Sequence, residues 1–150
     1  MTSKLSLLIG IGSRVRKSPY YDSTLKYGVK GFTIYNKMYL PTGFSNPEKE
    51  YFNLINDVTF GDFAAERQVE VNGPDAFKFI QYINPRNLSK FNIGDCKYII
   101  LTGSDGGIIN DACLIKLEEE KFWVSPGDGD VLLWLQGLAI NSGMNVTIHE

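Results

Sequence analysis

The chain has 150 residues, of which 43% are hydrophobic and 21% are charged, and its formal net charge is −2. This length suffices for one domain with a hydrophobic core, and the plentiful apolar residues exclude an intrinsically disordered chain. The slightly acidic charge balance argues against nucleic acid as a partner, because phosphate binding needs clustered lysines and arginines.

The first apolar run, residues 5–9, is too short to span a membrane, and no small-residue cleavage site follows it. We therefore expect neither a transmembrane span nor a signal peptide, and no membrane partner. Two cysteines and one histidine do not supply a His/Cys metal set, so no metal site is predicted. So few cysteines suit a reducing compartment, and the predicted location is the cytoplasm.

Two short elements are predicted next. Ser18 and Pro19 suit the N-cap and the first position of a helix that ends at Gly28. Residues 32–35 are rich in β-branched and aromatic side chains and predict a strand. The chain should remain extended after this strand until Pro41 stops it.

A second helix is predicted to begin at Asn46 and Pro47, with acidic residues in its first turn, where the helix dipole favours them. Its apolar stripe is predicted to consist of Tyr51, Leu54 and Ile55. Residues 58–60 then predict a short strand.

From Gln68 onward, strand and helix patterns alternate. Residues 68–71 alternate polar and apolar side chains as a strand does, and Asn72 with Gly73 predicts a turn. A helix should start at Pro74 and end before Pro85, which disfavours helical geometry at the preceding residue. The buried face of this helix is predicted to carry Phe77, Ile80 and Ile83.

The remaining chain predicts four strands and one helix. The strands are residues 96–101, 108–117, 122–125 and 145–149, with a turn at 118–120. The helix covers about residues 131–140, is capped by Asp128 or Asp130, ends at Gly143 and buries Leu132, Leu133, Leu135 and Leu138. The order β-α-β-β-β-α-β predicts an α+β fold, in which helices pack on one face of an antiparallel sheet.

The glycine pair at Gly106 and Gly107 is the most informative stretch. Asp105 with Gly106 is a strong hairpin signal, so Asp111 should lie a few residues into a strand, on rigid backbone. Successive side chains of a strand point to opposite faces, so Asp111, Cys113 and Ile115 should share one face of the strand at residues 108–117. On the partner strand, Trp123 and Ser125 should share a face in the same way. If the register brings these faces together, they form the kind of wall that ligand sites have. The alternatives are a solvated strand face for Asp111 and core packing for Tyr98, Cys113 and Trp123.

Four short segments occur in a set order: residues 16–20, 35–38, 64–70 and 106–111. Together they resemble the glycine-cleavage T-protein family, the tetrahydrofolate-dependent aminomethyltransferases. The branch that contains dimethylsulfoniopropionate demethylases and their T-protein-like relatives is the most similar. Because family members are far longer, the resemblance implies that residues 1–150 are the truncated N-terminal part of a folate-binding domain.

The resemblance also assigns roles to individual residues. Asp111 falls on the second acid of the family motif G-G-x-x-D-D, near the reactive folate nitrogen, and Asn110 replaces the first acid. Tyr98 falls on a tyrosine that lines the pterin site, and Ser125 falls where T-proteins have a pterin-binding asparagine. Glu66 replaces a family methionine, as in the demethylase branch. The predicted catalytic residue is Asp111, and the predicted cofactor-binding residues are Glu66, Tyr98, Asp111, Cys113, Trp123 and Ser125.

Two further features of the sequence each have two interpretations. Glu66 and Arg67 are either functional or a solvated, locally paired charge couple. The aromatic residues Tyr20, Tyr21, Tyr35 and Tyr39 either form part of a cage for a cationic substrate or serve as core and rim aromatics.

The resemblance implies a one-carbon transferase that uses tetrahydrofolate, with a small-molecule donor or a lipoyl carrier protein as its partner. A dimethylsulfoniopropionate demethylase-type methyltransferase is the first alternative. The second is a non-catalytic module that binds folate or self-associates, because a chain truncated at Glu150 would lack groups that complete the family's site and would be inactive alone.

Overall fold

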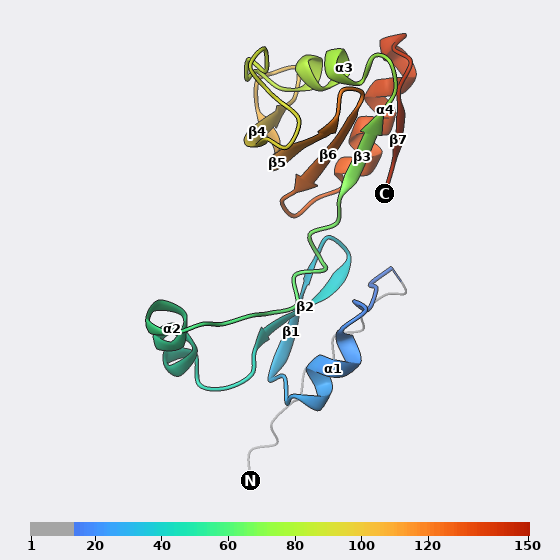
Figure 1. Cartoon of the computed structure of the whole chain (residues 1–150). Helices are drawn as coiled ribbons and strands as arrows, with labels where there is room; N and C mark the ends of the chain where they lie inside the picture. The colour runs from blue at the N-terminus through green and yellow to red at the C-terminus, as the bar shows by residue number, and fades with distance from the viewer. Residues whose placement is uncertain (1–13) are drawn as a thin grey trace. The chain divides into compact units, whose positions relative to one another are not determined.

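The computed structural model describes residues 14–150, which belong to two units, residues 1–65 and residues 66–150 (Figure 1). The apolar run at residues 5–9 lies outside the described residues. Among residues 14–150, no helix has both the length and the apolar character needed to cross a bilayer.

The first unit contains the helices α1 (Tyr21–Lys26) and α2 (Pro47–Asn56) and a hairpin of β1 (Gly31–Tyr35) and β2 (Met38–Gly43). Helix α1 ends near Gly28 as predicted, where the backbone has a φ of 79°. Its predicted N-cap is wrong. The Ser18 hydroxyl accepts a hydrogen bond from the Tyr20 N–H at 3.1 Å in the preceding turn, so Tyr20 becomes the N-cap.

The β1–β2 hairpin corrects the prediction of one extended segment that ends at Pro41. Asn36 and Lys37 adopt φ angles of 47° and 60°, and Tyr35 pairs with Met38 across this two-residue turn. Asparagine tolerates this left-handed geometry, so the chain reverses there. Strand β2 then continues through Pro41, which a two-stranded sheet allows because both strands are edges.

Helix α2 begins as predicted but buries nothing. The Asn46 side-chain oxygen accepts hydrogen bonds from the N–H groups of Glu48 (2.9 Å) and Lys49 (3.3 Å), which is a side-chain N-cap. The helix has no buried residue, and its large apolar side chains Tyr51, Phe52, Leu54 and Ile55 are 49–62% exposed. The predicted strand at residues 58–60 is wrong, since Val58 and Phe60 are 92% and 100% exposed and pair with no strand in the described chain.

The second unit confirms the predicted α+β class and the predicted order of elements. Its elements are β3 (Val69–Asn72), α3 (Ala76–Ile83), β4 (Cys96–Thr102), β5 (Ile108–Glu118), β6 (Lys121–Pro126), α4 (Val131–Ser142) and β7 (Thr147–His149). The strands form one antiparallel sheet in the order β4-β5-β6-β3-β7 (Figure 1).

One hydrophobic core joins both helices to one face of this sheet. The sheet contributes alternate residues, including Val71, Leu101, Leu114, Phe122 and Val124, and the helices contribute Phe79, Ile80 and Leu135. Two predicted core positions are wrong. Phe77 is 37% exposed while Phe79 is fully buried, and Leu133 is 60% exposed. Helix α4 is apolar nearly all round, so its sequence pattern does not select the buried face.

The ends of both helices follow the predicted signals. Asn84 is extended, with a φ of −140° and a ψ of 149°, because Pro85 follows it. Helix α4 ends at Gly143, which takes the left-handed conformation with a φ of 65°. Asp130 rather than Asp128 occupies the N-cap position of α4.

Candidate functional site

The sheet face opposite α3 and α4, hereafter the open face, carries five of the six predicted site residues. Along β5, Asn110, Ala112 and Leu114 are buried, whereas Asp111 and Cys113 are exposed. The register pairs Cys113 with Tyr98 of β4 on one side and with Ser125 of β6 on the other. Ile115 pairs with Trp123. The predicted pairing of the two strand faces is therefore confirmed, and an acid, a thiol, an indole and a hydroxyl lie on one surface.

Asp111 is held in the middle of a regular strand by the turn before it. Gly106 takes a φ of 79°, and the Asp105 carboxylate accepts a hydrogen bond from the Gly107 N–H at 2.9 Å. The Tyr98 hydroxyl donates to Asp111 Oδ2 at 2.7 Å. This hydrogen bond is the main reason that the pKa of Tyr98 is raised. The phenol therefore stays protonated and keeps the carboxylate in one orientation.

Asn110 holds the loop after β6 against the strand that carries Asp111. The Asn110 amide is 5% exposed. Its oxygen accepts from the Gly127 N–H at 3.0 Å, and its nitrogen donates to the Asp128 carbonyl at 3.3 Å. An asparagine can do both, whereas an ionised aspartate only accepts. The structure thus gives a physical reason for an asparagine at position 110.

Gly127 leaves the space that the Asp111 carboxylate occupies. The Gly127 N–H also donates to the Asp111 carbonyl at 2.9 Å. A Cβ atom at position 127 would lie 2.9 Å from Asp111 Oδ1, which is closer than side-chain atoms pack. Sequence reasoning missed Gly127 and the role of Asn110, because both depend on contacts between β5 and a loop far along the chain.

Gln68 is a polar group of this site that sequence reasoning also missed. Its amide nitrogen donates to Ser125 Oγ at 3.0 Å and to the Glu66 carbonyl at 3.1 Å. Its amide oxygen is buried and has no hydrogen-bond partner among the described residues. The alternation of residues 68–71 was the available signal, because it places Gln68 and Glu70 on the face opposite Val69 and Val71.

Trp123 is bound into a charged cluster at the far end of the same face. Its indole N–H donates to Glu70 Oε2 at 2.9 Å, and Lys121 Nζ lies 3.3 Å from the same oxygen. His149 Nε2 lies 3.5 Å from Glu70 Oε1. The indole hydrogen bond is the main cause of the lowered pKa of Glu70, and Lys121 adds to it. Trp123 is 37% exposed, so the ring is not simple core packing and retains accessible surface.

Glu66, the sixth predicted residue, lies just before β3 and is exposed. Its neighbour Arg67 forms an ion pair with Glu150, at the end of the described chain. Partial burial raises the pKa of the Cys113 thiol, and the thiol of Cys96 and the charge of Glu66 contribute in the same direction. Within residues 14–150, no three His, Cys, Asp or Glu side chains gather into a metal site.

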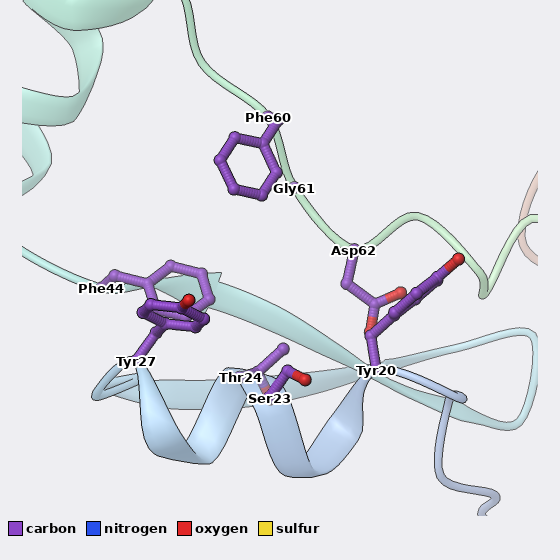
Figure 2. A pocket seen from close by; sticks show the side chains of 8 residues that line it. All are labelled: Tyr20, Ser23, Thr24, Tyr27, Phe44, Phe60, Gly61 and Asp62. Carbon is purple, nitrogen blue, oxygen red and sulfur yellow. The ribbon is translucent and has the colours of Figure 1, made fainter.

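The first unit has a cavity of its own, with a volume of about 570 Å³. Aromatic residues and one carboxylate line much of it, namely Tyr20, Tyr27, Phe44, Phe60 and Asp62 (Figure 2). Of the four tyrosines predicted as a cage, only Tyr20 lines this cavity. Tyr21 instead stacks on Phe32 with ring centroids 5.1 Å apart, and Lys17 Nζ lies 4.6 Å from its ring centre. Tyr39 lies 5.4 Å from Tyr21, measured between ring centroids, so these two tyrosines pack with Phe32 as an aromatic cluster.

An antiparallel sheet with helices on one face and gathered polar groups on the other defines an α+β domain. The family model described as the GCVT N-terminal domain matches residues 20–150. The chain therefore belongs to this family, that of the glycine-cleavage T-proteins, as the sequence resemblance predicted.

Individual relatives include proteins with different stated activities. The chain is 38% identical to the dimethylsulfoniopropionate demethylase DmdA of Ruegeria pomeroyi over 137 residues, which is 91% of this chain and 38% of that protein. It is 29% identical to an aminomethyltransferase of Porphyromonas gingivalis over 119 residues, which is 78% of this chain and 32% of that protein. The chain thus spans about a third of the length of these relatives.

The fold is also similar to that of a solved structure. The glycine cleavage system aminomethyltransferase T from Bartonella henselae matches with a TM-score of 0.69 and 22% sequence identity, covering 89% of this chain and 37% of that one. This similarity supports the shared fold.

Proposed function

We propose that this chain supplies part of the folate site of a tetrahydrofolate-dependent one-carbon transferase of the glycine-cleavage T-protein (aminomethyltransferase-like) family. The observation that carries the proposal is the Asp111 carboxylate, fixed in mid-strand and bound by the Tyr98 hydroxyl at 2.7 Å on the open face. Membership of the GCVT family supports tetrahydrofolate as the cofactor.

The groups on the open face fit the pterin ring of tetrahydrofolate. A pterin presents N–H donors and ring acceptors on a flat aromatic body. The exposed Asp111 carboxylate can accept from such donors. Ser125 accepts from Gln68, which leaves its own O–H to donate. The accessible part of Trp123 offers a flat apolar surface.

Tetrahydrofolate, when bound, supplies the nitrogen that accepts the one-carbon unit. The role of Asp111 is to stabilise positive charge that develops beside it, as a preoriented carboxylate does at low energetic cost. Tyr98 acts on Asp111 and not on the reacting atoms, because its hydroxyl is used in orienting the carboxylate. Cys113 lies between Tyr98 and Ser125 in the same cross-strand row and contributes apolar contact.

A titration of the whole chain with tetrahydrofolate, followed by tryptophan fluorescence, tests this proposal. Asp111→Asn should weaken binding by about tenfold or more, because a hydrogen bond to a charged group contributes roughly 1.5–3 kcal/mol. Asp57→Asn, at the C-cap of α2, is the matched control and should leave the affinity unchanged. Equal affinities of the Asp111→Asn variant and the wild type, or no saturable binding by the wild type, would reject the site.

The one-carbon donor divides this proposal into two reactions. A sulfonium donor is favoured by the 38% identity to the Ruegeria pomeroyi demethylase over 91% of this chain, and by Glu66 at the family's methionine position. A lipoyl carrier protein is the alternative partner, as suits an aminomethyltransferase. Supplying dimethylsulfoniopropionate or an aminomethylated carrier protein with tetrahydrofolate distinguishes them, because the first yields methyl-folate and the second yields methylene-folate.

A non-catalytic, self-associating module is the candidate from a different class. Helix α2 favours it, because its large apolar side chains are about half exposed or more in the described chain and it has no buried residue. Exposed apolar surface of this kind promotes association between copies. In this interpretation the occupant of the apolar face of α2 is a second copy of the chain.

A further inference from the structure

The only two cysteines of the chain lie on neighbouring strands of the same sheet and on the same face. Cys96 of β4 pairs with Ile115, and Tyr98 of β4 pairs with Cys113 of β5. Cys96 and Cys113 are therefore diagonal neighbours, offset by two residues across the β4–β5 ladder. Both side chains are exposed, so a solvent-borne reagent can reach them.

The register places the two thiols on one face of neighbouring strands, separated by one residue pair along the β4–β5 ladder. Partial burial is the main reason that the pKa of the Cys113 thiol is raised, and the Cys96 thiol contributes in the same direction. Diagonal neighbours on adjacent strands are about 7–8 Å apart, which is beyond the usual Cα separation in a disulfide, so the two backbones must move closer for the bond to form. A bond between them would need a small backbone adjustment and would be strained, which makes it easy to reduce.

The location gives this pair a consequence for the site. Cys113 stands between Tyr98 and Ser125 in one cross-strand row, and Asp111 is two residues away on the same face of β5. A bond that pulls Cys113 toward Cys96 displaces the centre of this row. The same bond closes the surface between β4 and β5 beside the Tyr98–Asp111 hydrogen bond.

We propose that Cys96 and Cys113 are a reversible oxidation site, in which peroxide closes a disulfide across β4 and β5 and thereby weakens ligand binding on the open face. The disulfide stands on the geometry alone. Its effect on binding rests on the proposed folate site.

The chemistry balances with hydrogen peroxide as the oxidant. One thiolate attacks a peroxide oxygen, the O–O bond breaks, and a sulfenic acid and a hydroxide form, which takes up a proton to become water. The second thiolate then attacks the sulfenic sulfur, the S–S bond forms, and the S–O bond breaks with release of a second water. Two thiols and one peroxide thus give a disulfide and two waters, and a small-molecule dithiol reverses the change.

Intact mass measurement of the whole chain after brief peroxide treatment tests the bond. The expected result is a loss of two hydrogens without added oxygen, a peptide that joins Cys96 to Cys113, and full reversal by dithiothreitol. Cys96→Ser and Cys113→Ser should instead gain oxygen or form linked dimers. Oxygen addition without a disulfide in the wild type, or bonds only between different molecules, would overturn the proposal.

A probe that needs no oxidation gives an independent measurement. Phenylarsine oxide bridges two thiols that lie near each other, so the reduced chain should bind it in a one-to-one ratio. Each single serine variant should lose this binding. Failure of the reduced wild type to bind the arsenical would contradict the closeness of the two thiols.

A tetrahydrofolate titration of the reduced and oxidised wild type tests the effect on ligand binding. The oxidised chain should bind at least about tenfold more weakly, and peroxide-treated Cys96→Ser should not show this loss. A disulfide that leaves the affinity unchanged would overturn the regulatory part. If the reduced wild type binds no folate, the proposed function fails while the mass result still decides the disulfide.

Discussion

The hydrogen bond from Tyr98 to Asp111 can be measured without any ligand. Because the Asp111 carboxylate is the main cause of the raised pKa of Tyr98, Asp111→Asn should lower that pKa toward the ordinary tyrosine value. An alkaline absorbance titration, with Tyr98→Phe subtracted to isolate one phenol, measures the shift. Glu118→Gln, at an exposed carboxylate at the end of β5, is the control. An unchanged Tyr98 titration would show that the two side chains do not meet in solution.

Asn110 is predicted to stabilise the fold because its side-chain amide both accepts and donates a hydrogen bond. Asn110→Asp should destabilise the fold by about 1–3 kcal/mol at neutral pH, because an ionised carboxylate cannot donate to the Asp128 carbonyl and is buried beside Asp111. Urea unfolding measures this loss. Asn87→Asp is a matched control, since the exposed Asn87 side chain only accepts, from the Ser89 N–H at 2.8 Å, and should change stability by no more than about 0.5 kcal/mol. Equal stabilities of the two variants would contradict this role.

The lowered pKa of Glu70 predicts that the folded chain loses stability at acidic pH. Its pKa in the folded chain is lowered from 4.5, chiefly by the Trp123 indole and then by Lys121. The stabilisation is therefore fully present above pH 4.5 and is lost as the pH falls through the lowered value. Urea midpoints measured from neutral to acidic pH should show the wild type losing its advantage over Glu70→Gln in this window. Glu120→Gln, on the exposed β5–β6 turn, should show no such convergence.

At the scale of elements, α2 should unfold independently of the rest of the chain. Asn46→Ala removes the two cap hydrogen bonds at 2.9 and 3.3 Å, at a cost of about 1 kcal/mol. Because α2 buries no residue, the urea midpoint of the whole chain should stay constant. Amide hydrogen exchange in α2 should instead become about fivefold faster. Lys49→Ala, within the same helix, is the control, and a shifted global midpoint for Asn46→Ala would show that α2 is coupled to the core.

The elements that were predictable are those whose signals are local. Asn46 caps α2, Pro85 extends Asn84, and Gly143 ends α4, because each effect acts within one turn of chain. The β1–β2 turn was not predictable in this way, since Asn36 is followed by Lys37 rather than by the glycine that marks such turns. Leu133 was misplaced because an all-apolar helix has no polar face to orient it.

The open face was predictable from the period-two pattern of strands. This pattern correctly groups Asp111 with Cys113 on one face of β5. It also pairs that face with the face of β6 that carries Ser125, because β5 and β6 are regular where they meet. The contacts of Gln68 and Asn110 were not predictable, because they join segments separated by 57 and by 17 to 18 residues. Their partners are set by tertiary packing and not by neighbouring sequence.

At the scale of the whole molecule, the apolar side chains of α2 determine whether the chain is monomeric or self-associates. Four of them, Tyr51, Phe52, Leu54 and Ile55, are 49–62% exposed in the described chain. A surface of this kind is costly in water and is relieved when another apolar surface covers it. We therefore expect the isolated chain to self-associate through α2.

Sedimentation velocity over a range of concentrations measures this association. The wild type should sediment faster as its concentration rises, whereas the double variant Leu54→Lys with Ile55→Lys should remain monomeric, because lysine preserves helix propensity and removes the apolar surface. Leu133→Lys, at a leucine of α4 that is 60% exposed, is the matched control and should behave as the wild type. A wild type that stays monomeric at every concentration would reject the self-associating module, and association that persists in the double variant would place the contact outside α2.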